Sequence, residues 1–261
     1  MQPRNPNNAR GIDISVWQGN IDWVKVKESG ISFAFIKATE GQFLVDKYFA
    51  TNVRNAKEVG ILVGAYHFCR AEDNITAQKE AEYFIDAINS IGGFNVFDLP
   101  SVLDIETTEG GNKSNITSIC HTWLDLVKIT SGKIPLIYTN NNIAANYLDE
   151  SLAIYPLWLA RYGIHQPPDV SGWDQWTFFQ YSDSGNVPGI SGNVDMNEYA
   201  GNFEKLMSIY GGEYKMTPED ANKIITAFLG PIYNFVTDPK EKEECNRLAN
   251  ELRKASGQPT K

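Results

Sequence analysis

Short apolar runs alternate with amphipathic stretches over the first 210 residues of this 261-residue chain. The runs have the length of buried strands, and the early stretches between them repeat apolar residues at helical spacing, which is the pattern of a β/α protein. The strand-like runs cover residues 11–16, 32–37, 61–68, 100–106, 134–139, 156–160, 177–181 and 194–197. The helical patterns cover residues 21–29, 48–59, 75–91 and 115–130.

The number of strands narrows this class of folds. After Thr139 the helical segments shrink, and Gly and Pro separate strands that follow one another closely. Eight strands with helices chiefly in the first five units predict an α/β fold, an irregular TIM-like (β/α) barrel with fewer helices than strands. A flavodoxin-like open sheet is the structural alternative, but it needs fewer strands.

The chain changes character near Gly211 and Gly212, which divides it into residues 1–211 and 212–261. Thr217 and Asp238 each precede a proline and an acidic residue, the signature of a capped helix start. Two apolar faces follow these caps, and Gly230-Pro231 is expected to interrupt the first of them. We therefore predict a small α-helical module at the C-terminus, too small to be robust without packing on something. The faces consist of Ile224, Ile225, Phe228 and Leu229, and of Cys245, Leu248, Ala249 and Leu252.

Charge and composition exclude several classes of partner. The net charge of −9 lies wholly in residues 1–212, because the eight acidic and eight basic residues of 213–261 cancel. Such an acidic surface repels nucleic acid. The sequence has three cysteines without motif spacing and three histidines. We therefore expect no disulfide framework, no metal site and no cofactor. No apolar run approaches the roughly 20 residues of a membrane span, so we expect no membrane insertion.

Two acidic residues lie at the C-terminal end of the strand predicted over residues 100–106. Asp104 and Glu106 point to one face because side chains alternate along a strand. Carboxylates at the C-terminal end of a buried strand are costly unless they lie at a catalytic mouth. Held close together they cannot both ionise freely, so one pKa should rise, which gives the protonated acid and ionised partner that glycoside hydrolysis needs. The alternative is two strand-end carboxylates that simply meet solvent.

Two more acids are expected at the same mouth. Asp13 lies on the first strand and Asp195 on the last, and these strands are neighbours in a closed barrel. Aromatic and amide side chains at other strand ends suit sugar rings and their polar substituents, although core packing is the alternative for each. His67 fits a packed, hydrogen-bonded histidine better than a general base. The expected lining residues are Tyr66, Tyr138, Trp158 and Gln180.

The motifs GIDISVWQG, FAFIKATEG, GAYHF, LPSVLDIE, PLIYTN, PLWLARY, FFQYS and NVDMN occur in this order between residues 10 and 210. Together they resemble glycoside hydrolase family 25, the Chalaropsis-type lysozymes common among phage endolysins. The resemblance implies an irregular barrel that hydrolyses the β-1,4 bond between N-acetylmuramic acid and N-acetylglucosamine in bacterial peptidoglycan. It also implies that Glu106 is the general acid, Asp104 its partner, and Asp13 and Asp195 the flanking acids.

Two routes are open for the rest of the reaction. In one, the substrate's 2-acetamido oxygen attacks the anomeric carbon while Asp104 holds the acetamido group, which gives retention. In the other, a carboxylate activates water, which gives inversion; the spacing of the two acids on one strand favours retention. One competing function is a chitinase-like hydrolase, whose longer motif has acidic residues at the positions of Leu99 and Val102. The other is a non-hydrolytic saccharide-binding protein on the same barrel.

The N-terminal residues Met1 to Asn8 are polar, so the sequence predicts no signal peptide. With the sparse, unpaired cysteines and the small C-terminal module, this predicts a phage endolysin that stays in the host cytoplasm before release and then acts on the cell wall. The alternative is a bacterial autolysin that is exported by another route. We expect the C-terminal module to bind that wall, the alternative being a helical clasp or a self-association element. The sequence does not indicate an oligomeric state.

Overall fold

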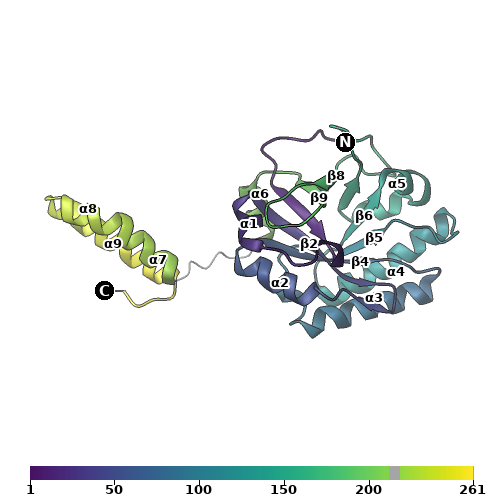
Figure 1. The fold of residues 1–261 in the computed structure, drawn as a ribbon, viewed down its shortest axis with the longest axis horizontal. Helices are drawn as coiled ribbons and strands as arrows, with labels where there is room; N and C mark the ends of the chain where they lie inside the picture. The colour runs from purple at the N-terminus through teal and green to yellow at the C-terminus, as the bar shows by residue number, and fades with distance from the viewer. Residues whose placement is uncertain (212–217, 261) are drawn as a thin grey trace. The chain divides into compact units, whose positions relative to one another are not determined.

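The computed structural model describes residues 1–211 and 218–260. It divides into two compact units, Met1–Gly211 and Gly212–Lys261, which are described separately. Figure 1 shows the first unit as a barrel of strands with helices around it and the second as a pair of helices.

Eight strands of the first unit close into a barrel, in which β1 pairs with both β2 and β9. Neighbouring strands from β1 to β8 run parallel, whereas β9 runs antiparallel to both β8 and β1. Closure confirms the predicted TIM-like barrel and excludes the open sheet. The strands are β1 (Arg10–Ile14), β2 (Ile31–Glu40), β4 (Leu62–Phe68), β5 (Val102–Ile105), β6 (Leu136–Asn140), β7 (Leu157–Ala160), β8 (Phe178–Gly185) and β9 (Val194–Tyr199), and the short β3 (Leu44–Val45) pairs with β2.

Long helices cover only part of the barrel. The segments after β4 and β5 form long helices, but the helix after β6 has seven residues. Residues 161–177, all of which the structure describes, contain no helix between β7 and β8, where two glycines and the pair Pro167-Pro168 interrupt helical spacing. The helices are α1 (Trp23–Glu28), α2 (Phe49–Glu58), α3 (Asn74–Ser90), α4 (Lys113–Ser131), α5 (Asn141–Tyr147) and α6 (Phe203–Tyr210), with 3₁₀ turns η1 (Val16–Gln18), η2 (Phe94–Val96) and η3 (Glu150–Ile154).

Aromatic rings fill the barrel interior below the mouth. Phe35 stacks on Trp158 with ring centroids 4.4 Å apart, and the edge of Phe178 meets Phe35 at 5.0 Å. Phe33 occupies so much of the interior that a Cβ added to Gly11 would lie 2.3 Å from its ring. The floor of the mouth is therefore rigid, since tightly packed rings leave little room for rotation.

The second unit is a helical hairpin. One helix runs through α7 (Pro218–Ile224), the π-helical turn η4 (Ile225–Leu229) and α8 (Gly230–Phe235), and α9 (Pro239–Ala255) packs along it. The expected interruption at Gly230-Pro231 is wrong, because the wider π turn lets Gly230 N–H bond to the carbonyl of Ile225 and accommodates the proline. Asp238 caps α9 as predicted, with its carboxylate accepting from Lys240 N–H at 2.8 Å. The predicted cap at Thr217 lies outside the described residues.

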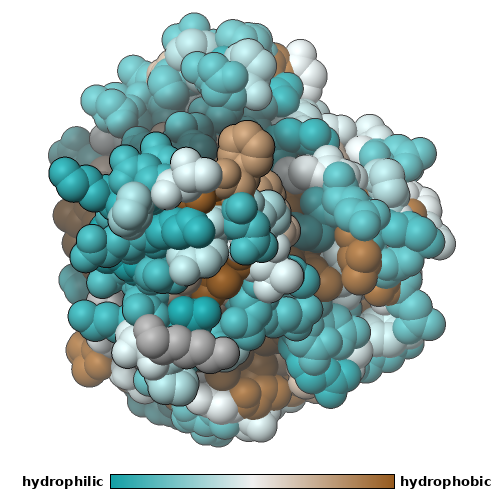
Figure 2. Space-filling model, turned by 90° about the vertical axis from the view of Figure 1, so that its left-hand side faces the viewer, coloured by the Kyte–Doolittle hydropathy of each residue, from teal (hydrophilic) through white to brown (hydrophobic). Residues whose placement is uncertain are grey.

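The surface is mainly hydrophilic on the face shown in Figure 2, with apolar side chains in separate patches. Within residues 1–211 and 218–260, every helix is too short or too polar to cross a membrane.

Candidate active site

A cleft with a volume of about 210 Å³ opens at the mouth of the barrel, where the parallel strands end. Seven of the eight predicted site residues line it, and the eighth, Gln180, is buried beneath them. The seven are Asp13, Tyr66, Asp104, Glu106, Tyr138, Trp158 and Asp195.

The first and last strands bring two of the acids together. Asp13 lies directly opposite Asp195 in the antiparallel pairing of β1 with β9. The sequence predicted that these strands are neighbours but not their opposite directions. That direction is decisive, because Asp195 is near the start of β9 and would lie at the closed end of the barrel if β9 ran parallel.

Two amides hold this acid pair. Gln180 Nε2 donates to Asp13 Oδ2 at 2.9 Å and to Asp195 Oδ2 at 3.4 Å, and Asn197 Nδ2 donates to Asp13 Oδ2 at 2.8 Å. Burial and the neighbouring Asp195 raise the pKa of Asp13 well above its usual value, although both amide bonds oppose the shift. Burial also raises the pKa of Asp195. Two such carboxyl groups side by side share a proton more readily than they both ionise.

Asp104 and Glu106 leave β5 on the same side but in different surroundings. Leu103 and Ile105 pack outward against the helices, as alternation predicts. Asp104 is only 5% exposed, whereas Glu106 is exposed at the edge of the cleft. Burial, then the charges of Glu106 and Asp13, raise the pKa of Asp104 well above its usual value. The predicted raised pKa therefore belongs to Asp104, the buried member.

One oxygen of Asp104 is buried without a partner. Asp104 Oδ1 accepts no hydrogen bond from the described residues, although its side chain lines the cleft. A buried unsatisfied acceptor is costly, and at a binding site it marks the place of a ligand's donor. The geometry is thus suited to a substrate that carries an N–H or O–H group.

Gln180 is oriented by two phenols. The hydroxyl groups of Tyr138 and Tyr162 each donate to Gln180 Oε1 at 2.8 Å, which leaves the amide N–H groups for the acid pair. Trp158 Nε1 donates to Asn197 Oδ1 at 2.8 Å. Gln180 and Trp158 are each 1% exposed, so the structure places them as supports beneath the carboxylates more than as an open binding surface.

Sequence reasoning missed four residues of this site. Asn197 follows Asp195 by two positions on β9, so strand alternation could have found it. Tyr162 follows the end of β7 in a strand-end motif, and Lys37 lines the cleft from β2. Trp17 is 86% exposed at the rim of the cleft, and an exposed tryptophan beside polar groups is itself a signal for ligand stacking.

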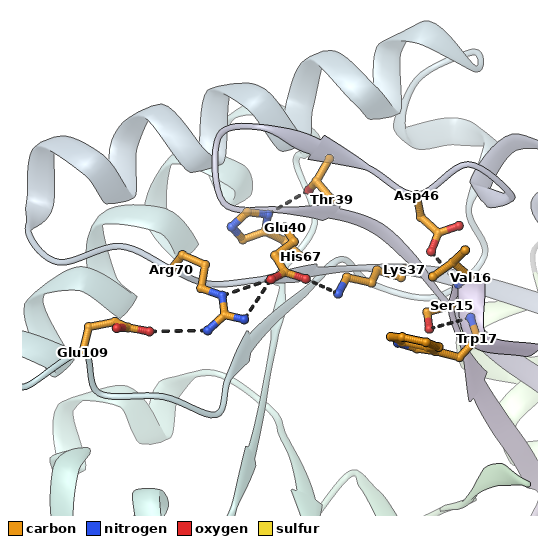
Figure 3. A network of polar contacts seen from close by, with 10 residues as sticks. All are labelled: Ser15, Val16, Trp17, Lys37, Thr39, Glu40, Asp46, His67, Arg70 and Glu109. Atoms are coloured by element: carbon orange, nitrogen blue, oxygen red, sulfur yellow. Dashed lines mark hydrogen bonds and ion pairs between the residues drawn. The ribbon is translucent and has the colours of Figure 1, made fainter.

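A chain of ion pairs runs beside the cleft (Figure 3). Glu40 lies between Lys37 Nζ at 2.6 Å and Arg70, whose Nε and Nη2 lie 3.0 and 2.9 Å from Glu40 Oε1. Both cations lie over the ring of Phe68, at 4.9 and 4.5 Å from its centroid. Burial opposes ionisation of Glu40, but hydrogen bonds from Lys37 and Arg70 outweigh it and lower the pKa.

The same chain reaches the loop that follows Glu106. Arg70 Nη1 lies 3.5 Å from Glu109 Oε1, and Thr107 Oγ1 donates to that oxygen at 2.9 Å. Glu109 adopts a positive φ of 44°, which is unusual for a residue with a side chain. These contacts fix the first turn after Glu106.

His67 points away from the cleft (Figure 3). Thr39 Oγ1 lies 2.8 Å from Nδ1, and Nε2 lies 2.9 Å from Glu80 Oε2. The fully buried ring also stacks on Trp123 at 5.7 Å. Burial lowers the pKa of His67, although Glu80 opposes the shift. It is a packed, hydrogen-bonded histidine, in agreement with the favoured interpretation of the sequence.

The cleft offers carboxylates but no cluster suited to a cation. Within the described part of the chain, no group of three or more His, Cys, Asp and Glu side chains is arranged to hold a metal ion. What the arrangement can do by itself is donate and accept protons beside a ligand.

Comparisons with known proteins agree with this geometry. Glycosyl hydrolases family 25 matches residues 12–190, within the first unit. Lysozyme M1 of Streptomyces globisporus is 38% identical over 218 residues, covering 79% of this chain and 73% of that protein. The bacterial lysozyme from Streptomyces coelicolor has a TM-score of 0.69 at 34% identity, covering 79% of this chain and 98% of that one. The CTP1L endolysin has a TM-score of 0.65 at 26% identity, covering 87% of this chain and 80% of that one.

Proposed function

The chain belongs to glycosyl hydrolases family 25, and from this premise we propose that Glu106 is the general acid with which it cleaves peptidoglycan. The family resemblance of the sequence motifs is confirmed, and the chain is a muramidase that hydrolyses the β-1,4 bond between N-acetylmuramic acid and N-acetylglucosamine. The observation that carries the residue assignment is the position of the two acids, because Glu106 is exposed at the edge of the cleft, where a glycosidic oxygen can reach it, whereas Asp104 is buried beside it.

In the first step Glu106 gives its proton to the glycosidic oxygen as the bond to the anomeric carbon breaks. The acetamido oxygen of the same sugar attacks that carbon, so the intermediate is a cyclic oxazolinium ion. In the second step water attacks the anomeric carbon and gives a proton to the Glu106 carboxylate, which restores the acid. The two inversions together retain the configuration, and no other reactant is consumed.

Asp104 would orient the acetamido group for this attack. Its unpartnered Oδ1 is placed to accept the acetamido N–H, which satisfies the buried acceptor. Binding favours the ionised form of Asp104, because the acetamido N–H and the positive charge that develops on this group both offset its raised pKa; Asp104 thus releases its proton to solvent before the attack and takes no part in the two proton transfers of Glu106. Asp13 and Asp195 would add negative charge beside it, and Trp17 at the rim would stack on a sugar ring.

A non-hydrolytic saccharide-binding protein on this barrel is not favoured, because the proton donor and all three neighbouring acids line the cleft. A chitinase-like hydrolase is not favoured either, since the longer acidic motif of that family is absent: Leu99 and Val102 stand in its place.

Replacement of Glu106 by Gln tests the assignment. The amide keeps the shape of the side chain and removes the transferable proton, so lysis of purified cell walls should fall by about 10²- to 10⁴-fold. The matched control is Glu82→Gln, which makes the same change at an exposed position on α3 and should leave lysis unchanged. Activity of Glu106→Gln within threefold of the parent contradicts the proposal.

We further propose that the protein is a phage endolysin that accumulates in the host cytoplasm and acts on the wall after release. Its similarity to the CTP1L endolysin and the three free cysteines, which suit a reducing compartment, support this setting.

We propose that residues 212–261 hold the enzyme on peptidoglycan. The balanced charge of this segment supports that role, because the acidic residues 1–212 are repelled by an anionic wall.

A further inference from the structure

A second recess adjoins the cleft at Glu106. It has a volume of about 400 Å³ and lies where β6 and β7 end, so we call it the β6–β7 recess. Glu106 and Tyr138 line both the recess and the cleft, whereas Asp104 lines the cleft alone. The other residues of the recess are Asn140, Asn141, Asn142, Ala160, Arg161 and Tyr162.

The position of Glu106 between the two hollows indicates which part of a substrate each one holds. A general acid marks the boundary between the two parts of a cleaved chain, because it protonates the oxygen that joins them. The sugar whose acetamido group meets the unpartnered oxygen of Asp104 lies in the cleft. The departing part of the chain then extends past Glu106 into the β6–β7 recess. This step rests on the proposed roles of Glu106 and Asp104.

The recess supplies a free cation beside an acidic cleft. Four carboxyl groups line the cleft, and among the described residues that line it the cation is Lys37, which is paired with Glu40 at 2.6 Å. Arg161 is exposed in the recess, and no carboxylate of residues 1–211 or 218–260 forms an ion pair with its guanidinium. All of its side-chain donors are therefore left for a ligand.

An unpartnered acceptor lies in the same recess. Asn140 and Ala160 are paired across β6 and β7, so Asn141 and Arg161 are the next residues on two neighbouring strands. Asn141 Oδ1 is buried and accepts no hydrogen bond from the described residues. A buried acceptor without a partner is costly, and in a recess it marks the place of a ligand's donor.

Helix capping explains why Asn141, and not its neighbour, is left without a partner. Asn140 Oδ1 accepts from the backbone N–H groups of Asn142 and Ile143, both at 3.0 Å, and so caps α5. Asn141 is the first residue of that helix, and its side-chain oxygen has no part in the cap. The recess thus combines a free guanidinium with a free amide oxygen, which suits a ligand that carries a carboxylate close to an N–H group.

We propose that the β6–β7 recess binds a carboxylate of the departing muropeptide, with Arg161 as its cation and Asn141 as the acceptor for a neighbouring N–H. A peptidoglycan chain has such a carboxylate in its stem peptides, or in the lactyl group of a muramic acid that has lost its peptide. A guanidinium matches a carboxylate with two parallel hydrogen bonds. A chain of neutral sugars has no carboxylate, so Arg161 makes the enzyme select muropeptides.

Substrates that differ in charge test the role of Arg161. Soluble peptidoglycan chains are prepared with their stem peptides and after removal of the peptides by an amidase, and part of each is amidated at its carboxyl groups. In Arg161→Gln, the ratio of kcat/KM on charged chains to that on their amidated counterparts should fall by about tenfold relative to the parent. The fall should lie mainly in KM, because the ion pair is present before and during bond cleavage alike. Arg161→Lys keeps the charge and should restore part of the ratio.

The matched control is Arg54→Gln, which makes the same change at an exposed position on α2 and should keep the parent's ratio. A ratio that falls with the peptide-bearing chains identifies a stem carboxylate as the ligand, and one that falls with the stripped chains identifies the lactyl carboxylate. A ratio that stays at the parent's value in Arg161→Gln overturns the proposal, even if activity falls on every chain. A parent that cleaves none of the chains contradicts the proposed function itself, so the two failures are distinguishable.

Discussion

Asp104 and Glu106 lie two positions apart at the end of one strand, but Asp104 is buried and Glu106 is exposed, so their carboxyl groups have different roles. Strand alternation predicts that both face the mouth, and it also predicts which neighbours pack outward. How deeply each is buried could not be predicted, because burial depends on rings from other strands that fill the interior. Asn197 was within reach of the same alternation, but the amide that holds Asp13 becomes evident only once β9 is paired with β1.

Replacement of Asp104 by Asn should reduce turnover by about 10²-fold or more, since the acetamido group loses an ionisable partner. The deciding measurement is the configuration of the first-formed product, followed by NMR with the parent enzyme. A β anomer is expected if the acetamido oxygen attacks. An α anomer would establish direct attack by water and remove the proposed role of Asp104.

Asp13 should make the native state less stable as the pH rises. Its pKa is raised on folding, so between the unfolded value near 3.9 and the folded value the native state binds more protons than the unfolded state. Stability is therefore greatest below the unfolded pKa and is lost as pH increases through the folded pKa. The melting temperature of the parent should fall accordingly from pH 4 towards pH 7.

The variant Asp13→Asn should remove this part of the pH dependence. Its amide oxygen can still accept from Gln180 and Asn197, and its N–H can donate to Asp195. It should melt higher than the parent at pH 7, by about 2–4 °C for each kcal/mol recovered, with little gain at pH 4, while activity is lost. Asp86→Asn, an exposed change on α3, is the control. An equal shift at both pH values would show that the buried charge is not the cause.

At the level of helices and strands, periodicity located all eight barrel strands and the four helices of the first half. It did not predict that β9 runs antiparallel to its neighbours, because the spacing of apolar residues along a strand is the same for both chain directions. It also failed at Gly230-Pro231, since local propensity favours a break there while the π turn and packing on α9 carry the helix through.

The ion-pair chain through Glu40 links two strands to the loop after Glu106, so its loss should act on catalysis more than on folding. In Glu40→Gln, Lys37 and Arg70 lose their common anion, and the turn that holds Glu109 loosens. Because small displacements of catalytic groups are costly, kcat on soluble peptidoglycan chains should fall by about tenfold, with KM changed less. An unchanged kcat, with the melting temperature as a separate check on folding, would rule out this positioning role.

For the whole molecule, the sequence break at Gly211 coincides with the boundary between two compact units. Sequence motifs and the family match describe the first unit, whereas nothing in them describes the second. For the second unit, the charge could be read from the sequence, but the exposure of its apolar side chains could not, because exposure depends on how α9 packs against the other helix.

A chain that ends at Gly211 should separate catalysis from attachment. The barrel has its own core and its complete cleft, so activity on soluble muropeptide chains should equal that of the full chain. Pelleting with intact walls should weaken, because the tail no longer raises the local concentration of enzyme on the insoluble substrate. Unchanged pelleting, or a destabilised barrel, would show that the tail is structural.

The pairing of β1 with β9 has a further consequence during translation. Asp13 leaves the ribosome long before Asp195 and Asn197, which emerge only after the other seven strands of the barrel have been made. At about 5–20 residues per second, the nascent chain spends on the order of ten seconds or more between these two events without a closed barrel or an assembled acid pair. Chains that stop before β9 therefore lack the active site, and the producing cell is exposed to hydrolytic activity only from chains that have been translated through β9.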